Sequence, residues 1–459
     1  MRWSFFRDGT VLKEQILALL PRLENSYLKV VIKSAPSSWV ALLVSLVIKS
    51  YSQKAAPVTR IFVLDYTRFR EDLEALDRYT DIEFLVIPNW TQRWITAIDN
   101  DPLSRRSKVQ SKRNQQFLGN LLSSLCRKKA AAGFISCGIY YAQNLSWEIA
   151  CSSSSIPFFC LHREFIGAEP DTLNRLISKH ISNWKRFHGD VIMLATNSSK
   201  DMLTKYRYAE QKSIVVTGAP RFDIVHHEVV SKKERIKLEA KKTIVLFSFA
   251  PVTGQPDLRI VKGTFPDSGG FQKLFFAVHE CVTRFAVDHP DVRVVIKPKW
   301  YRSRWKDAID KSVISVTGNL EARPSNLEIV DDIPALQLIA EAGLVISLNS
   351  TTGFEALMCS IPSILPHFEE AAGSLREALW LKNSVGPFWV AKSRNELECL
   401  LRTFISGGLQ AKKVPTGYFD NIIGPTDGKA STRVRDHILT KIDEMKRLNP
   451  SLVTSYSHK

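Results

Sequence analysis

Short apolar runs rich in β-branched residues alternate along this chain with longer segments of helical periodicity. In the first half, these runs lie at residues 28–32, 59–64, 83–87, 132–136, 156–160 and 190–195. Turns that contain small residues, and then helical patterns, follow them. Because strands of a parallel sheet are buried on both faces, continuous apolar runs that alternate with helices predict a mostly parallel sheet with helices on both sides.

A second series of strands begins after the strongly charged stretch at residues 231–242. Its predicted strands are residues 243–248, 292–296, 327–330, 344–347 and 363–365, with helices at 270–287, 334–342 and 430–445. We therefore expect an α/β protein with two Rossmann-like lobes facing a central cleft, and ligands at the carboxyl ends of the strands. The expected divisions are an N-terminal lobe at 1–224, a linker at 225–242, a C-terminal lobe at 243–429, and a closing helix and tail at 430–459.

The most apolar stretch, residues 39–48, is about ten residues long, well short of the ~20 that a membrane-spanning helix needs. It predicts a buried helix of the first lobe. Asp8 and Gly9 interrupt the apolar character of the first residues, so no secretion signal is expected.

Composition narrows the class of partner. The 459 residues are enough for two domains, and 63 Lys and Arg against 46 Asp and Glu give a net charge of +17. Such a charge favours anionic partners: nucleic acid, an acidic membrane face or phosphorylated small molecules. The seven cysteines form no Cys-x-x-Cys pair, so neither a disulfide scaffold nor a structural zinc site is expected, and a reducing cytosol fits best.

The segment 343–364 predicts a strand, a hydroxyl-rich turn, a helix and a second strand. Ser350, Thr351, Thr352 and Gly353 fall where the helix begins. A helix N-terminus offers free N–H groups and partial positive charge, so phosphate binds there readily. Thr352 and Glu355 also have the spacing of a capping box. Glu355 is therefore expected either to cap its own helix or to hold a sugar or ribose hydroxyl.

Three motifs carry a resemblance to a known family. Residues 350–356, Ser-Thr-Thr-Gly-Phe-Glu-Ala, with Pro362, resemble the donor-binding segment of GT-B glycosyltransferases of bacterial surface-carbohydrate and capsule biosynthesis. Residues 215–223 resemble the Thr-Gly-x-Pro-Arg-x-Asp signature between the lobes of these proteins. Residues 294–299, Val-Val-Ile-Lys-Pro-Lys, stand where relatives have Arg-Pro-His-Pro. The resemblance covers residues 190–365 well and the first lobe by topology only.

The resemblance implies a donor site in the second lobe. Lys297 stands in place of the usual Arg and Lys299 in place of His, so positive charge for a donor phosphate is kept while proton transfer by histidine is lost. Both lysines could instead be solvated residues after a strand. Arg221 is expected near the donor phosphates, or in a structural hinge in which Asp223 pairs with it. The loop after the first strand of this lobe adds Ser248 and Thr253 as weaker candidates.

Glycosyl transfer needs a base for the acceptor hydroxyl, usually a carboxylate or histidine. Glu164 and His162 follow the predicted strand 156–160 and are the first candidates, with Asp65 after strand 59–64 as the next. Each could instead be a helix cap or a member of an ion pair. A helix dipole and lysines can stabilise the departing phosphate, so we expect no metal and no cofactor, with the nucleotide-sugar as substrate.

We therefore expect a glycosyltransferase that moves a sugar from a nucleotide-activated donor to a growing surface polysaccharide or a lipid-linked acceptor. The alternatives are a nucleotide-sugar 2-epimerase or a polyol-phosphate transferase of the CDP-glycerol type on the same fold, because a fold does not define its chemistry. A non-catalytic basic binding protein is the alternative from another class.

Basic clusters lie at residues 104–108, 112–113, 127–129, 183–188 and 300–305. They predict either a solvated basic face or reversible docking on the anionic inner face of a membrane, where lipid-linked acceptors reside. No nucleic-acid-binding motif is evident, so no nucleic-acid partner is expected. The expected location is the cytoplasm, with the protein peripheral at the inner membrane face.

Overall fold

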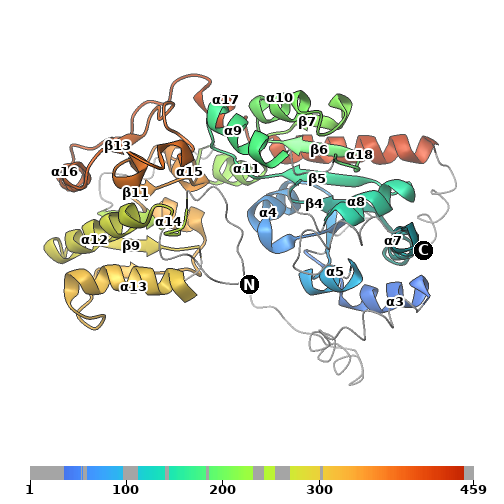
Figure 1. Cartoon of the computed structure of the whole chain (residues 1–459), viewed down its shortest axis with the longest axis horizontal. Helices are drawn as coiled ribbons and strands as arrows, with labels where there is room; N and C mark the ends of the chain where they lie inside the picture. The colour runs from blue at the N-terminus through green and yellow to red at the C-terminus, as the bar shows by residue number, and fades with distance from the viewer. Residues whose placement is uncertain are drawn as a thin grey trace.

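The computed structural model describes residues 36–52, 54, 59–96, 112–139, 144–181, 186–230, 242–253, 269–299 and 303–448. Two β-sheets, each flanked by helices, form two lobes (Figure 1). The predicted strand at 28–32, most of the predicted linker, and all or part of the basic clusters at 104–113, 183–188 and 300–305 lie outside the described residues.

The N-terminal sheet has the strand order β1-β3-β2-β4-β5-β6-β7. Only the short edge strand β1 is antiparallel to its neighbour, and the other pairs are parallel. The predicted strands that fall within the described residues all form, shifted by at most two residues. The strands are β1 (Lys49–Ser50), β2 (Arg60–Val63), β3 (Glu83–Val86), β4 (Ala131–Ser136), β5 (Phe158–His162), β6 (Val191–Leu194) and β7 (Ile214–Val216).

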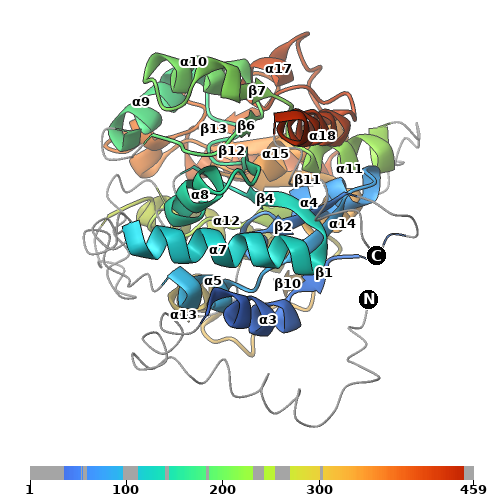
Figure 2. The ribbon, with the colours of Figure 1, turned by 90° about the vertical axis from the view of Figure 1, so that its right-hand side faces the viewer.

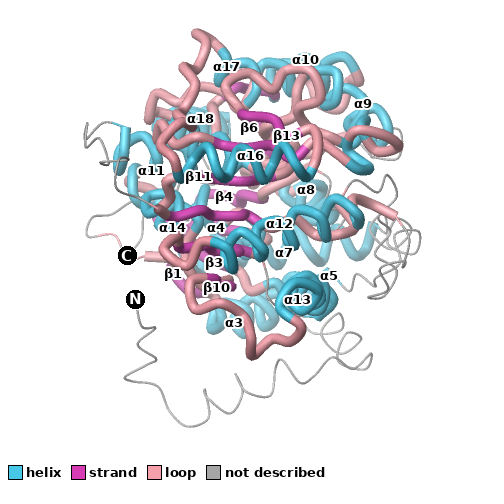
Figure 3. The backbone as a smooth tube through the Cα atoms, turned by 90° about the vertical axis from the view of Figure 1, so that its left-hand side faces the viewer, coloured by secondary structure: helices cyan, strands magenta, loops and turns pink. Residues whose placement is uncertain are grey.

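The C-terminal sheet is parallel throughout, in the order β10-β9-β8-β11-β12-β13. In chain order this is 3-2-1-4-5-6, the order of a dinucleotide-binding Rossmann fold. Figure 3 shows the strands in magenta among their helices. The strands are β8 (Thr243–Phe247), β9 (Arg293–Lys297), β10 (Leu327–Ile329), β11 (Leu344–Ser347), β12 (Ser363–Pro366) and β13 (Trp389–Ala391).

Helices cover both faces of each sheet because the strand side chains alternate between two apolar clusters. Phe62 and Leu64 pack with the helices on one face of the N-terminal sheet, and Ile61 and Val63 with those on the other. The helices of the first lobe are α3 (Ser37–Val47), α4 (Arg70–Tyr79), α5 (Asn89–Thr96), α7 (Lys112–Lys129), α8 (Asn144–Ser153), α9 (Pro170–Ile181) and α10 (Asn197–Lys205). Those after β7 are α11 (Arg221–Val225), the π-helix η4 (His226–Val230), α12 (Gln272–Asp288), α13 (Ser303–Thr317), α14 (Ala335–Glu341), α15 (Thr351–Met358), α16 (Arg394–Ile405), α17 (Tyr418–Ile422) and α18 (Ala430–Leu448).

The last helix, α18, returns to the first lobe. Val434, Ile438 and Ile442 recur every four residues, so they lie on one face, and they pack with Ile61 and Leu73 of the N-terminal lobe. Figure 2 shows α18 beside α4 and α11. The chain therefore crosses between the lobes twice, once through α11 and once before α18.

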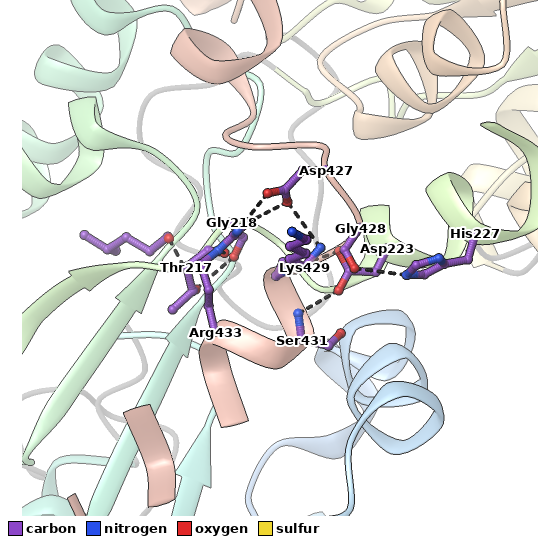
Figure 4. A network of polar contacts seen from close by, with 11 residues as sticks. Thr217, Gly218, Asp223, His227, Asp427, Gly428, Lys429, Ser431 and Arg433 are labelled. Atoms are coloured by element: carbon purple, nitrogen blue, oxygen red, sulfur yellow. Dashed lines mark hydrogen bonds and ion pairs between the residues drawn. The ribbon is translucent and has the colours of Figure 1, made fainter. Parts of the chain in front are cut away.

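Asp223 joins these two crossings, as Figure 4 shows. Its carboxylate accepts hydrogen bonds from the backbone N–H groups of Ala430 (3.1 Å) and Ser431 (2.6 Å), and so caps the N-terminus of α18. Arg433, one turn on, donates from Nε to the carbonyl of Thr217 (2.8 Å). The predicted pairing of Asp223 with Arg221 is wrong, because the carboxylate is committed to the helix N-terminus.

An apolar cluster also spans the lobes. Phe222 of α11 and Ile166, from the loop after β5, pack with Phe354 of α15 and with Phe388. The predicted burial of residues 39–48 holds for one side only of α3. Its other side is exposed, because α3 covers the edge of the lobe rather than its centre.

A buried carboxyl on α8 makes stability depend on pH. Burial raises the pKa of Glu148 from 4.5 to about 7, against the opposing hydrogen bond from the backbone N–H of His188. Because the folded state holds this proton more tightly than the unfolded chain, the contribution of Glu148 to stability is greatest below pH 4.5 and falls as the pH rises towards 7. At about 1.4 kcal/mol per pKa unit, the loss is roughly 3 kcal/mol.

We therefore expect Glu148→Gln, which keeps an acceptor for His188 and cannot ionise, to raise the melting temperature at pH 8 and to flatten its decline between pH 5 and 8. The control is Glu321→Gln at an exposed position. Melting curves of the two variants that stay parallel across this pH range would contradict the assignment.

Candidate functional site

Each sheet has a switch point, a place where two neighbouring strands lead to connections on opposite sides of the sheet. The switch points of the two sheets lie toward the space between the lobes. In the C-terminal sheet the switch lies between β8 and β11, which precede Ser248 and Ser350. In the N-terminal sheet it lies between β2 and β4, and Asp65 follows β2. In open α/β sheets the crevice at the carboxyl ends of such strands is the usual ligand site.

The turn after β11 begins helix α15 as predicted. Ser350 is its N-cap, and its Oγ accepts from the backbone N–H of Thr352 (3.3 Å). Gly353 is required by packing, because a Cβ there would lie 2.5 Å from Ser347 Oγ and 3.0 Å from the Phe388 ring. The predicted capping box of Thr352 and Glu355 is wrong, since the cap lies two residues earlier.

Glu355 is thereby left without a capping role. It is buried, 8% exposed, and burial raises its pKa to about 6 although the nearby Arg221 guanidinium and the Thr351 hydroxyl lower it. The negative charges of Glu71 and Asp72 of the first lobe also raise the pKa of Glu355. A carboxyl with a perturbed pKa, one turn into a helix at a switch point, is a functional-site candidate.

Arg221 forms a buried ion pair with Asp72 of α4. The backbone N–H (3.2 Å) and Nε (3.0 Å) of Arg221 donate to Asp72 Oδ1, and Nη2 donates to Oδ2. Burial alone would raise the pKa of Asp72, but the charge and hydrogen bonds of Arg221 outweigh it and hold the pKa below its usual value. The structure thus gives Arg221 a structural partner, and contact with a donor stays a prediction.

Further charges from both lobes meet around Glu71, whose side chain is 63% exposed. Arg163, after β5, approaches it with Nη1 3.8 Å from Glu71 Oε2. Glu71 also acts electrostatically on Lys297 and Lys299, after β9 of the second lobe. The pKa of Lys299 is lowered by partial desolvation and by the Arg163 charge, which Glu71 and Glu164 oppose. Lys297 donates from Nζ to the carbonyl of Asp331 (2.7 Å).

The three predicted acid–base residues lie at the carboxyl edge of the N-terminal sheet, as expected. His162 is the last residue of β5 rather than part of the following loop, and it is buried. Burial lowers its pKa to about 4, against a weaker effect of Glu164, so the imidazole is neutral at pH 7. Asp65 is buried and takes a left-handed conformation at φ 55°. Glu164 is half-buried, and its charge favours the protonated forms of both His162 and Lys299, so it raises the pKa of each.

The Ser248 hydroxyl is engaged in a polar chain inside the second lobe. His279 Nδ1 faces the carbonyl of Phe275 (2.7 Å) and must donate to it, so Nε2 accepts from Ser248 Oγ (2.9 Å). Trp305 Nε1 in turn donates to Ser248 Oγ (3.0 Å). These contacts position the loop after β8. Thr253 is half-buried at the edge of residues 254–268, which are not described, and donor contacts of both residues stay predictions.

Among the described residues, no group of three or more His, Cys, Asp or Glu side chains is placed to hold a metal ion. Nor is any helix in those ranges long and apolar enough to cross a bilayer.

Glu71, Asp72 and Arg163 are the site residues that the sequence did not single out. Glu71 and Asp72 look like ordinary acids in the first turn of a helix, where the helix dipole favours them anyway. In the sequence, only the position of Glu71 and Asp72 sets them apart from such ordinary acids. They lie in the first turn of α4, the helix that follows β2 at the switch point of the sheet.

No family model matches this sequence, and neither does any curated protein. Solved structures do match. A variant of the wall teichoic acid polymerase TagF is 11% identical, with 95% of this chain and 99% of that chain covered and a TM-score of 0.51. A putative UDP-N-acetylglucosamine 2-epimerase from Listeria monocytogenes is 11% identical over 85% and 98% of the two chains, with a TM-score of 0.48. The epimerase from Methanocaldococcus jannaschii, in complex with UDP-GlcNAc and UDP, is 14% identical over 83% and 99%, with a TM-score of 0.45.

The likeness to TagF spans nearly the whole of both chains and shows the fold. The predicted fold class is confirmed: this is an α/β protein of two Rossmann-like lobes in a GT-B-like arrangement.

The Arg221–Asp72 pair can be tested by its stability. Asp72→Ala leaves a buried guanidinium without a counter-charge, which should cost about 3–5 kcal/mol of unfolding free energy. Glu71→Ala, at the adjacent but exposed position, should change it by no more than about 0.5 kcal/mol. Urea denaturation at pH 7 measures both.

Replacing both partners, Asp72→Leu with Arg221→Met, should recover most of the loss, because no buried charge is then left unpaired. Equal denaturation midpoints for Asp72→Ala and Glu71→Ala would show that the buried pair does not stabilise the fold as described.

Proposed function

We propose that this chain is a transferase that binds a nucleotide-activated donor between its lobes and passes the activated group to an acceptor of surface-polymer assembly. The observation that carries the proposal is the N-terminus of α15 at the switch point of a Rossmann-like sheet, with the buried Glu355 one turn on. Lys299 of the second lobe and Arg163 of the first are cations that interact with Glu71, and Glu71 also interacts with Glu355.

The donor phosphates would lie at the first turn of α15. Its free backbone N–H groups and the hydroxyls of Thr351 and Thr352 provide donors, and the helix dipole adds positive charge. Lys297 and Lys299 would face the same phosphates from the end of β9. As the bond to the transferred group breaks, negative charge grows on the departing phosphate, and fixed dipoles and lysines stabilise it without a metal.

Glu355 would hold a hydroxyl pair of the donor. With a pKa of about 6 it is mostly ionised at neutral pH, so both carboxylate oxygens can accept hydrogen bonds from the sugar or ribose. Burial removes water from the Glu355 carboxylate and so disfavours its charge. Hydrogen bonds donated by two hydroxyls of the donor would replace that lost solvation. A bound donor should therefore lower the pKa of Glu355.

The acceptor would approach from the N-terminal sheet. Glu164 is the proposed general base, since the neutral and buried His162 lies two residues away and Glu71 is engaged with Arg163. His162 would orient Glu164 or the acceptor. Asp65 remains the second choice for the base. The proposed acceptor is a glycan or a lipid-linked molecule, and such an acceptor fits the expected location of the chain at the inner membrane face.

The nature of the transferred group decides between two activities. TagF is by its name a wall teichoic acid polymerase, so a polyol-phosphate donor is the specific rival to a nucleotide-sugar on this fold. An epimerase would convert a nucleotide-sugar with no acceptor present. A panel of UDP-, CMP- and GDP-sugars with CDP-glycerol therefore separates a sugar donor from a polyol-phosphate donor, and conversion of a nucleotide-sugar without acceptor would identify an epimerase.

The first test is donor binding. With the tightest-binding member of that panel, Thr351→Ala combined with Thr352→Ala should weaken affinity roughly tenfold or more, because two donors to the phosphates are lost. Isothermal titration calorimetry measures the affinity, and melting curves check that the fold survives.

The matched control is Ser393→Ala, which removes the N-cap of α16 elsewhere in the same lobe. It should leave affinity unchanged. Unaltered affinity in the double threonine variant would remove the α15 N-terminus from the site, and no binding of any panel member by the wild-type chain would overturn the proposed function.

The second test concerns the acceptor base. Glu164→Gln should keep donor affinity and lower turnover by roughly 10²–10⁴-fold, the usual contribution of a general base. Release of the nucleotide in the presence of acceptor reports turnover. Glu71→Gln should lower it less, because its exposed carboxylate is proposed only to balance the cations.

Near-normal turnover in Glu164→Gln together with a large loss in Asp65→Asn would move the base to Asp65. An unfolded Glu164→Gln would show that the carboxylate acts in structure alone.

A further inference from the structure

Helix α3 is apolar on both of its sides. Val40, Ala41 and Val44 are buried against α7, whose Leu121 and Leu125 belong to the same cluster. The opposite side exposes four large side chains, with exposed fractions of 69%, 48%, 36% and 38%: Trp39, Leu42, Leu43 and Leu46. The last three lie three, four and seven residues after Trp39, so all four side chains form one stripe along the helix.

This stripe is unusual within the described residues. Of the eight large hydrophobic side chains that are exposed there, α3 holds four, and the others are scattered: Val287, Ile314, Leu320 and Leu448. Single exposed apolar residues are ordinary, whereas a contiguous patch marks an interaction surface. Figures 1 and 2 place α3 at the outer side of the N-terminal lobe, beside α7 and away from the C-terminal lobe.

The segment that contains the stripe is basic, and two of its basic residues form ion pairs: Lys54 with Asp77 and Arg60 with Glu83. From residue 25 to residue 64 the sequence has no Asp or Glu and five basic residues: Lys29, Lys33, Lys49, Lys54 and Arg60. Lys49, just after α3, is exposed, and so are Arg127 and Lys128 at the end of α7, the helix packed against α3. The whole chain adds a net charge of +17.

We propose that the exposed stripe of α3 docks on an anionic lipid bilayer. The helix would lie in the plane of the interface, with its four apolar side chains in the headgroup–acyl boundary and the neighbouring lysines and arginines near lipid phosphates. Trp39 suits this position, since its ring is apolar and its N–H remains able to reach polar headgroups. With 11 residues, about 16 Å at 1.5 Å per residue, α3 lies on a membrane and does not span it.

Two other occupants fit less well. A second copy of this chain would bring the same positive charge against itself, and a helix about 16 Å long and about 10 Å wide offers less area than the roughly 1,000 Å² of a stable interface. The chain's own residues 1–35 would explain the apolar stripe but not the exposed Lys49, Arg127 and Lys128 beside it. The membrane is the partner that matches both the stripe and the charge.

The docking surface and the interlobe site use different residues, so each can be tested without the other. Full-length protein is sedimented with vesicles of phosphatidylcholine alone and of phosphatidylcholine with phosphatidylglycerol. We expect binding to the anionic vesicles only, fading as salt screens the charges over roughly 10 Å at 0.1 M.

Leu42→Gln with Leu46→Gln should lower the partition coefficient roughly tenfold or more, because two buried leucines are lost from the boundary. The matched control, Val287→Gln with Leu320→Gln, changes two exposed apolar side chains elsewhere and should bind as the wild type does. Quenching by brominated lipid should decrease in Trp39→Phe if α3 enters the boundary.

Equal binding by both double variants would overturn the proposal. A wild type that ignores anionic vesicles would overturn it too. In that case, a lower melting temperature of Leu42→Gln with Leu46→Gln would assign the stripe to the chain's own residues 1–35, and a shift from dimer to monomer in sedimentation velocity would assign it to a second copy.

Discussion

The buried pair of Arg221 and Asp72 holds the arrangement on which the rest of this molecule depends. Arg221 begins α11, the segment that leaves the first lobe, and Asp72 lies on α4 of that lobe. Two residues on, Asp223 caps α18, the helix that returns. Because an isolated buried charge is strongly unfavourable, neither end of this joint can open alone. The joint thereby anchors both crossings between the lobes to the first lobe.

The same joint explains the electrostatics between the lobes. Asp72 satisfies the guanidinium of Arg221, so the exposed Glu71 beside it is left to meet Arg163 and the lysines after β9. Glu355 is buried close to Arg221 and has a raised pKa. The site thus combines a helix N-terminus and cationic side chains, which suit phosphate, with a desolvated carboxylate, which suits hydroxyl groups.

Much of this architecture could be predicted from the sequence, because strand periodicity and turn residues are local signals. The α15 turn at Ser350 and the parallel sheets are examples. The capping box failed because Ser350 and Thr352 are both acceptable caps and spacing alone does not choose between them. Asp72 was missed because its partner is 149 residues away along the chain. The exposed stripe of α3 was missed because a helix apolar on all sides has no pattern that tells its buried side from its exposed side.

The most direct measurement of the central claim is a crystal structure with a bound nucleotide donor. The account predicts that the phosphate oxygens lie within hydrogen-bonding distance of the backbone N–H groups of Thr351 and Thr352, with Glu355 against a hydroxyl of the sugar or ribose and Lys299 near the phosphates. A nucleotide bound away from the α15 N-terminus, or phosphates turned from it toward solvent, would contradict the account.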